Sequence, residues 1–335
     1  MNEYRLYGVE MSPYSVKVRS CLRYKKIPHE WIVRSMDRMA EFNRHAKLPL
    51  VPCLACPDGS GLQDSTPIME FLEDRHPEHP VRLADPTLDF LSALIEEYAD
   101  EWCNKFMFHY RWYYERDADS AALRIAQELM PAGSPADAAQ QMAPSLKARM
   151  VPRLSFVGSG RDNTANALLI ERSFERTARI LDGLLAHRAY LFGGRPAMAD
   201  FGLYGQFKEL LSDPTPGNWL RANAPHLVAF VERMEDPVAL TGIAPMADVL
   251  PGISRLLREE IAGCFLPWSD ANARAVAAGA PTFSVHVDGV DFTQETQKYH
   301  AKSLAEIRRK FARASGETAL TAVLAETGCL AWLEG

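Results

Sequence analysis

The sequence predicts an α+β fold: a small mixed sheet, a helical middle part, and an extra carboxy-terminal segment of helices with one hairpin. Short strand and helix signals alternate over the first part of the chain, helical periodicity dominates after Pro86, and an Asp288-Gly289 step separates two β-rich runs near the end. With 335 residues, 47% of them hydrophobic, the chain can bury more than one core. We therefore expect units at residues 1–80, 86–245 and 246–335.

Local signals predict the elements of the first unit. Pro57-Asp58-Gly59-Ser60 is typical of a hairpin turn, and His76-Pro77 ends the helix that precedes the boundary. The expected strands are residues 4–8, 29–33, 51–55 and 61–63, and the expected helices are 12–24, 36–44 and a segment that begins near Ser65.

The first of these helices begins at Ser12, which is a favoured N-cap residue, and Pro13 suits the first helical position. A helix start that follows a strand directly offers unpaired N–H groups and the positive end of the helix dipole, which together stabilise an anion. The Ser12 hydroxyl could donate a hydrogen bond to that anion. The alternative is that Ser12 only caps the helix.

Helical periodicity governs the second unit, with helices expected at residues 87–116, 163–187 and 225–234 and a weaker pattern over 121–152. The residues expected to be buried in the helix at 163–187 are Leu168, Ile170, Phe174, Ala178, Ile180 and Leu184.

Residues 190–204 resemble the second signature of the cytosolic glutathione S-transferases, which implies a buried helix entered through a capping box and a hydrophobic staple. The N-cap position holds Ala197, which has no hydroxyl, so Asp200 must satisfy the turn alone. The missing cap should lower stability by about 1 kcal/mol.

The chain resembles the cytosolic glutathione S-transferases in the order and spacing of four features. These are the capped helix at Ser12, the Val51-Pro52 step, the Asp64-Ser65 helix start and the 190–204 segment. The resemblance covers roughly residues 4–240, and Ala197 departs from it because the family usually has Ser or Thr there. It implies a thioredoxin-like, glutathione-binding first domain followed by an all-α domain.

In this family a hydroxyl activates the thiol of glutathione, and the resemblance assigns that role to Ser12. A free thiol has a pKa of about 8.5, and lowering it by about two units requires roughly 2.7 kcal/mol of thiolate stabilisation. A hydrogen bond to a charged group supplies about 1.5 to 3 kcal/mol. Tyr7 is the alternative donor, because tyrosine-type relatives place theirs near the end of the first strand.

The resemblance also implies the groups that hold glutathione. Val51-Pro52 would be a cis peptide whose Val51 backbone binds the cysteinyl part, and Lys47 would pair with the glycyl carboxylate. Ser65 would bind the γ-glutamyl carboxylate, with Asp64 near the amino group. The cofactor-binding residues implied are Tyr14, Lys47, Val51, Pro52, Asp64 and Ser65.

The end of the helix at 87–116 has more aromatic residues than one core face requires. One interpretation is that these side chains line the pocket for an apolar co-substrate, and the other is core or dimer packing. The candidates are Phe106, His109, Tyr110 and Tyr113.

Cys53 and Cys56 have the spacing of a redox pair but lie on a predicted strand, where positions i and i+3 point to opposite faces. His76-Pro77-Glu78-His79 lacks the geometry of a metal site, and Gly158-Ser159-Gly160 is neither a nucleophile elbow nor a phosphate loop.

The third unit, residues 246–335, exceeds the usual length of the family. A helix is expected at 253–265, a hairpin at 283–292 and a helix at 295–314 with Leu304, Ile307 and Phe311 buried. The other faces of the last helix are basic and solvated. A further hypothesis is that the extension folds over the cleft and sets substrate choice.

We thus predict a cytoplasmic, homodimeric glutathione S-transferase active in detoxification, with glutathione as co-substrate, no metal, and a small-molecule electrophile as partner. The alternatives are a glutathione-dependent isomerase or dehalogenase, or a glutathione-binding interaction protein without activity. A net charge of −6 gives no electrostatic argument for nucleic acid or an anionic membrane. The six dispersed cysteines fit a reducing compartment, and the sequence shows no leader or membrane span.

Overall fold

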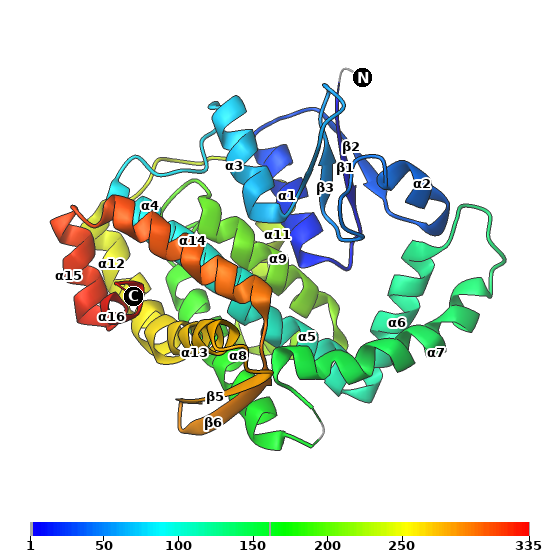
Figure 1. Ribbon diagram of the computed structural model, residues 1–335. Coiled ribbons are helices and arrows are strands. Elements are labelled where there is room, and N and C mark those ends of the chain that lie inside the picture. The colour runs from blue at the N-terminus through cyan, green and yellow to red at the C-terminus, as the bar shows by residue number, and fades with distance from the viewer. Residues whose placement is uncertain (1–2, 161, 335) are drawn as a thin grey trace.

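The computed structural model describes residues 3–160 and 162–334 and confirms the α+β fold class (Figure 1). Its amino-terminal sheet has the order β2-β1-β3-β4, with β1 parallel to β2, and with β3 antiparallel to both β1 and β4. The elements are β1 (Tyr4–Gly8), α1 (Pro13–Tyr24), β2 (His29–Val33), α2 (Met39–Phe42), β3 (Cys53–Ala55), β4 (Gly61–Gln63) and α3 (Ser65–Arg75).

The alternation of side chains along the strands explains how this sheet is covered. Leu6 and Leu54 share an apolar cluster with residues of α1 and α3, whereas Tyr7 and Cys53 pack with Phe42 of α2 on the opposite face. Successive residues of a strand point to opposite faces, so each strand contributes to both layers. Figure 1 shows α1 and α3 on one side of the strands and α2 on the other.

The helical part departs from the sequence prediction in two places. The long helix expected at 87–116 is α4 (Pro86–Tyr98), which continues through a π-helical turn (Ala99–Cys103) into α5 (Asn104–Tyr113) and ends earlier than expected. The weakly patterned region forms two paired helices, α6 (Glu115–Leu129) and α7 (Ala138–Met150). Their signal is weak because alanines supply much of the buried stripe of α6.

Helix α8 (Thr164–Leu185) forms as expected, but one of its predicted buried residues is wrong. Leu168 is 57% exposed, while the neighbouring Leu169 is fully buried. One residue along a helix turns the side chain by about 100°. The other predicted residues of this helix (Ile170, Phe174, Ala178, Ile180 and Leu184) are buried.

Helix α9 (Met198–Ser212) is buried along most of its length and packs against both α1 and α4. Gly205 allows the close approach, because a Cβ at this position would lie 2.5 Å from the Pro13 carbonyl oxygen at the start of α1. The Asp200 carboxylate accepts hydrogen bonds of 2.8 Å from the backbone N–H groups of Ala197 and Leu191, so it satisfies the turn without a hydroxyl at Ala197. The helices α10 (Pro214–Asn223) and α11 (Pro225–Arg233) follow.

The helix expected at 253–265 is longer in the structure. It runs from α12 (Met246–Leu256) through a π-helical stretch (Leu257–Phe265) into α13 (Leu266–Ala277). The predicted hairpin is present as β5 (Thr282–Val287) and β6 (Val290–Glu295), with Asp288 and Gly289 at positive φ in its turn. The helices α14 (Lys298–Ala314), α15 (Thr318–Thr327) and α16 (Leu330–Leu333) complete the chain.

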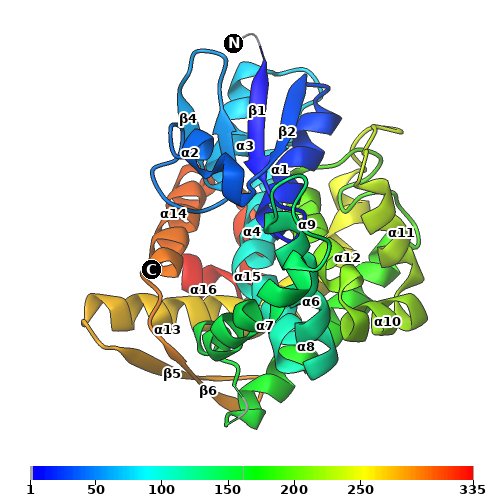
Figure 2. The same cartoon turned by 90° about the vertical axis from the view of Figure 1, so that its right-hand side faces the viewer.

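Helix α14 joins the extension to the rest of the molecule. Leu304, Ile307 and Phe311 are buried as predicted, and the Phe311 ring lies 5.6 Å from the ring of Phe90 in α4. Figure 2 shows α14 beside α4, with the amino-terminal sheet above it and α13 below. The extension therefore packs on the helical part and reaches the amino-terminal domain.

Candidate functional site

Ser12 lies at the start of α1, as the sequence predicts. Its backbone is extended, its side-chain oxygen accepts a 3.3 Å hydrogen bond from the N–H of Ser15, and its own N–H donates to the Val9 carbonyl at 3.2 Å. In this cap the hydroxyl acts as an acceptor, so its proton remains able to donate. The Val51-Pro52 peptide, on the loop before β3, is cis as predicted.

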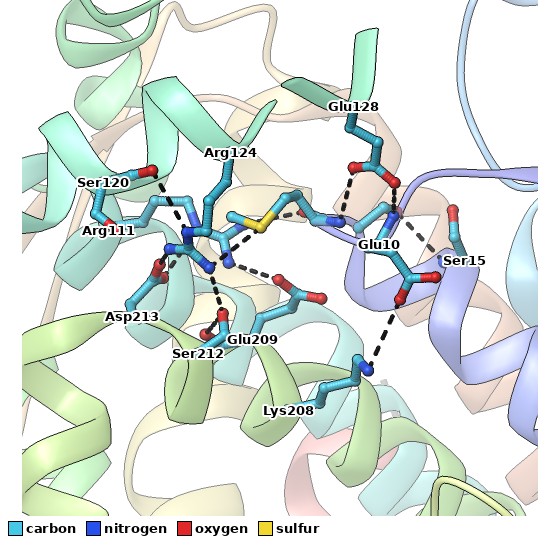
Figure 3. A network of polar contacts seen from close by, with 12 residues as sticks. Glu10, Ser15, Arg111, Ser120, Arg124, Glu128, Lys208, Glu209, Ser212 and Asp213 are labelled. Atoms are coloured by element: carbon cyan, nitrogen blue, oxygen red, sulfur yellow. Dashed lines mark hydrogen bonds and ion pairs between the residues drawn. The ribbon is translucent and has the colours of Figure 1, made fainter. Parts of the chain in front are cut away.

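The loop before Ser12 is held by side chains from the helical part (Figure 3). The Glu128 carboxylate of α6 accepts hydrogen bonds from the N–H groups of Glu10 and Met11. Arg111 of α5 donates to the Met11 carbonyl at 3.0 Å and is itself paired with Glu209 and Asp213. Burial raises the pKa of the Glu128 carboxyl. Sequence reasoning missed these positions, because they lie about 100 residues or more from the loop they hold.

Tyr7, the alternative thiol activator, faces the other side of the sheet. It is fully buried, and its hydroxyl donates a 2.8 Å hydrogen bond to Glu41 of α2. Burial and this hydrogen bond raise the pKa of the Tyr7 phenol. Its hydroxyl is thus already engaged away from the start of α1, which favours Ser12 of the two.

The Asp64-Ser65 step forms the start of α3, but the Ser65 side chain points inward. Asp64 has a φ of 80°, and Ser65 is 1% exposed. The Ser65 hydroxyl donates to Asp100 at 3.3 Å and accepts from the Lys17 ammonium at 3.2 Å. The hydroxyl expected to face a ligand carboxylate is therefore part of a buried polar cluster.

The centre of that cluster is Lys17, a residue that sequence reasoning did not single out. Its ammonium pairs with Glu96 at 2.5 Å and with Asp100 at 2.6 Å, and the Lys17 side chain is 1% exposed. Burial alone would lower the pKa of Lys17, but the two carboxylates raise it. A lysine inside a helix that packs on a sheet gives no signal of such partners, because both carboxylates come from a distant segment.

Carboxylates outnumber the ammonium group in this cluster. Burial raises the pKa of Glu97 to about 8, with further increases from Glu96 and Asp100, and burial likewise raises the pKa of Asp100. At neutral pH the raised pKa keeps Glu97 mainly protonated, while Glu96 and Asp100 face the Lys17 ammonium beneath the first turn of α3. The cluster adjoins a cavity of about 450 Å³ lined by Asp64, Glu97 and Asp100.

The remaining predicted glutathione ligands lie on two separate segments. The Tyr14 hydroxyl donates to the Asp100 carbonyl at 2.9 Å, so Tyr14 faces the cluster. Lys47 is exposed on the loop that leads to the cis peptide, and Gln63 holds this loop by accepting from the N–H of Lys47 at 2.7 Å and donating to the Leu50 carbonyl at 2.8 Å.

The aromatic candidates of α5 lie mainly in the core. The ring of Phe174 is 6.1 Å from Phe106 and 5.0 Å from Tyr110, and both candidates are buried. His109 is fully buried and bonds to Ser159 at 2.6 Å and to Glu171 at 2.9 Å. Tyr113 is half-buried, with its ring 4.6 Å from that of His109. These contacts favour the packing interpretation for Phe106, His109 and Tyr110.

The cysteine pair behaves as the strand geometry predicts. Cys53 packs with Tyr7 and Phe42, whereas Cys56 belongs to the cluster on the other face of the sheet. Burial raises the pKa of the Cys53 thiol to about 11, and all six cysteines are free and buried.

Residues 3–160 and 162–334 contain no group of three or more His, Cys, Asp or Glu side chains arranged to hold a metal ion. Within these ranges, no helix has the length and apolarity needed to cross a membrane.

Residues 11–75 match the family model of the glutathione S-transferase N-terminal domain. No curated protein sequence matches the chain. Similar solved structures include a glutathione S-transferase of Methylobacterium radiotolerans in complex with glutathione sulfonate, which is 24% identical over 73% of this chain and 99% of its own, with a TM-score of 0.42.

Two further similar structures have lower identity. A glutathione S-transferase of Methylobacillus flagellatus with bound glutathione is 19% identical over 69% of this chain and 93% of its own (TM-score 0.41). A beta-etherase of Sphingobium sp. strain SYK-6 is 18% identical over 76% of this chain and 100% of its own (TM-score 0.42). The family match thus identifies residues 11–75 as a glutathione S-transferase N-terminal domain.

Proposed function

We propose that the protein is a serine-type glutathione S-transferase, in which Ser12 stabilises the thiolate of glutathione for attack on an apolar small-molecule electrophile. The observation that carries this proposal is the position of Ser12 at the start of α1. Its oxygen is held by the N–H of Ser15, while its proton is free to bond to a thiolate. The helix dipole adds to that stabilisation.

The proposed reaction is nucleophilic substitution or addition by sulfur. The thiol proton leaves to solvent, the thiolate forms a bond to the electrophilic carbon, and in a substitution the leaving group departs with the electron pair. A hydrogen bond to a charged group is worth about 1.5 to 3 kcal/mol, which corresponds to one to two pKa units of the thiol. Ser12 and the helix start together thus suffice to make the thiolate abundant at neutral pH.

We further propose that the protein acts in the cytoplasm as a homodimer, with a role in detoxification. All six cysteines are buried free thiols, which fits a reducing compartment. The homodimer rests on the family resemblance, and sedimentation of the full chain tests it directly. A monomer at micromolar concentration would contradict it.

The decisive experiment is a titration with reduced glutathione, in which calorimetry measures binding and ultraviolet absorbance measures the thiolate. Wild type should bind glutathione and ionise its thiol near neutral pH. Ser12→Ala should bind but raise the pKa of the thiol by one to two units, an effect of about 1.5 to 3 kcal/mol. Ser15→Ala is the matched control, because Ser15 lies one turn further along α1 and is fully buried.

Three outcomes would contradict the proposal. Failure of wild type to bind glutathione would remove the transferase function. A normal thiolate in Ser12→Ala together with a lost thiolate in Tyr7→Phe would transfer the activating role to Tyr7. If the thiol is ionised but no electrophile turns over, the protein is a binding protein rather than an enzyme.

A further inference from the structure

The first turn of α14, in the extension, reaches the start of α3 in the amino-terminal domain. The Tyr299 hydroxyl donates a 2.5 Å hydrogen bond to the Asp64 carboxylate, across 235 residues of sequence. The next residue, His300, bonds to Glu101 in the π-helical turn, and Lys310 pairs with Glu70 of α3 at 2.7 Å. These contacts place the extension at the Asp64 end of the candidate site.

The cavity of about 450 Å³ lies between these elements, and its two walls differ in charge. One wall, from α3, the end of α4 and the π-helical turn, carries the carboxyl groups of Asp64, Glu70, Glu97, Asp100 and Glu101. The other wall, from α14, carries Tyr299, Lys302, Lys310 and Glu306. Lys310 is paired with Glu70 and Glu306 with Arg309, which leaves Lys302 as the cation of this wall that can meet a ligand. A ligand group that fits both walls must carry a positive and a negative charge close together.

Two oxygens in the acidic wall lack partners. Asp100 is only 7% exposed, yet its Oδ1 has no hydrogen-bond partner among the residues that the structure describes, and the same holds for Oε1 of Glu97. A buried carboxylate oxygen without a donor is unfavourable by about 1 to 3 kcal/mol or more. An ammonium group, with three donors, would satisfy such oxygens.

We propose that the extension completes a binding chamber for the α-amino-acid head group of the thiol co-substrate, with Tyr299 as a positioning residue and Lys302 as a binding residue. The ammonium of the head group bonds to Asp64 and Asp100, and its carboxylate faces Lys302. The proposal rests on the proposed function, since glutathione carries such a head group on its γ-glutamyl end. It assigns the extension to recognition of the thiol co-substrate rather than of the electrophile.

Tyr299 acts through Asp64. A carboxylate accepts about four hydrogen bonds, so donation from Tyr299 to Oδ2 leaves room for the ligand ammonium. The same bond fixes the carboxylate rotamer before the ligand arrives, which reduces the ordering needed on binding. Tyr299 is 56% exposed, so its ring forms the edge of the chamber and leaves the interior open.

Calorimetric titration of the full-length protein with glutathione tests this role. Tyr299→Phe, which removes only the hydroxyl, should weaken glutathione binding about tenfold, the size of one hydrogen bond to a charged group. Cysteinylglycine lacks the γ-glutamyl group, so its affinity, measured by the same titration, should be equal in wild type and Tyr299→Phe. A fall in both affinities would mean a general structural role and would overturn the proposal.

Lys302→Gln tests the opposite wall and should also weaken glutathione binding by about tenfold. Lys298→Gln is the matched control, because it removes the same charge one turn earlier in α14, from an exposed residue that does not line the chamber. An equal loss in both variants would indicate a long-range charge effect and contradict the role of Lys302. Thermal unfolding of each variant checks that α14 stays in place.

The outcomes separate this inference from the proposed function. If wild type does not bind glutathione, both fail. If wild type binds glutathione and Tyr299→Phe binds it equally well or more tightly, the extension does not position the head group, and only the role of the extension is overturned.

Discussion

The Lys17 ammonium lies 2.6 Å from the Asp100 carboxylate beneath the first turn of α3, and this ion pair connects the two domains. Lys17 belongs to α1 of the amino-terminal domain, whereas Asp100 belongs to the π-helical turn that follows α4. The pair therefore fixes the position of the start of α3 relative to the helical part. The π-helical turn and the start of α3 both contribute to the chamber that α14 closes.

Removing the ammonium should be strongly destabilising. Lys17→Met leaves Glu96 and Asp100 buried without their counter-ion, which is expected to lower the free energy of unfolding by about 3 to 5 kcal/mol. Urea unfolding measures the change. Lys26→Met, at an exposed lysine, is the control. If Lys17→Met lowers the free energy of unfolding by less than about 1 kcal/mol, Glu96 and Asp100 become protonated when their counter-ion is removed.

The raised pKa of Glu97 predicts a pH dependence of stability. Because the folded-state pKa is about 8 and the ordinary value is 4.5, the folded protein binds more protons between these pH values, and stability falls as pH rises through this window. The fall in stability can be followed as a fall in the thermal unfolding temperature with rising pH. Glu97→Gln should make this fall smaller. Glu232→Gln, at an exposed glutamate, should leave the slope unchanged. An unaltered slope in Glu97→Gln would mean that other groups cause it.

A cysteine at the capping position should change the chemistry. Thiols at helix starts have a lowered pKa, so the thiol introduced by Ser12→Cys should be largely ionised at neutral pH. The new thiolate should attack a mixed disulfide of glutathione, so that the protein becomes glutathionylated and the other thiol is released. The rate should be at least about tenfold higher than that of the native cysteines, which are all buried. Mass spectrometry follows the product. The thiol introduced by Ser15→Cys, at a fully buried position, should stay unreactive.

Glu128 places a carboxylate beside the loop that ends at Ser12, where a thiolate would carry the same charge. Glu128→Gln should therefore lower the pKa of the bound glutathione thiol, by up to about one unit. Ultraviolet titration of the complex measures the shift. Gln127→Glu is the control, because it adds a carboxylate at an exposed neighbouring position and should have little effect. A raised thiol pKa in Glu128→Gln would show that the carboxylate chiefly orders the loop.

The missing cap of α9 can be restored. Ala197 has the extended backbone of an N-cap residue, and Asp200 already bonds to its N–H. Ala197→Ser supplies the oxygen for the reciprocal bond to the Asp200 N–H and should raise the free energy of unfolding by about 1 kcal/mol. Chemical denaturation measures the gain. A lower stability would mean that this fully buried position has no room for the hydroxyl.

Much of the fold could be predicted from the sequence because its signals are local. The Ser12-Pro13 helix start, the Asp58-Gly59 and Asp288-Gly289 turns and the apolar stripe of α14 each depend on neighbouring residues. The sequence predicts too short a helix for α12 and α13, because the π-helical stretch between them interrupts the periodic pattern. It gives only a weak signal for α6 and α7, because alanines supply much of the buried stripe of α6.

The sequence by itself determined which residue types stand at the candidate site: a serine at the start of α1, a Val-Pro step before β3 and an Asp-Ser step before α3. Only the tertiary structure decided which way they face. The inward turn of Ser65, the pairing of Lys17 with Asp100 and the reach of Tyr299 to Asp64 join segments between 35 and 235 residues apart. Such contacts follow from how whole elements pack, and no local propensity encodes that packing.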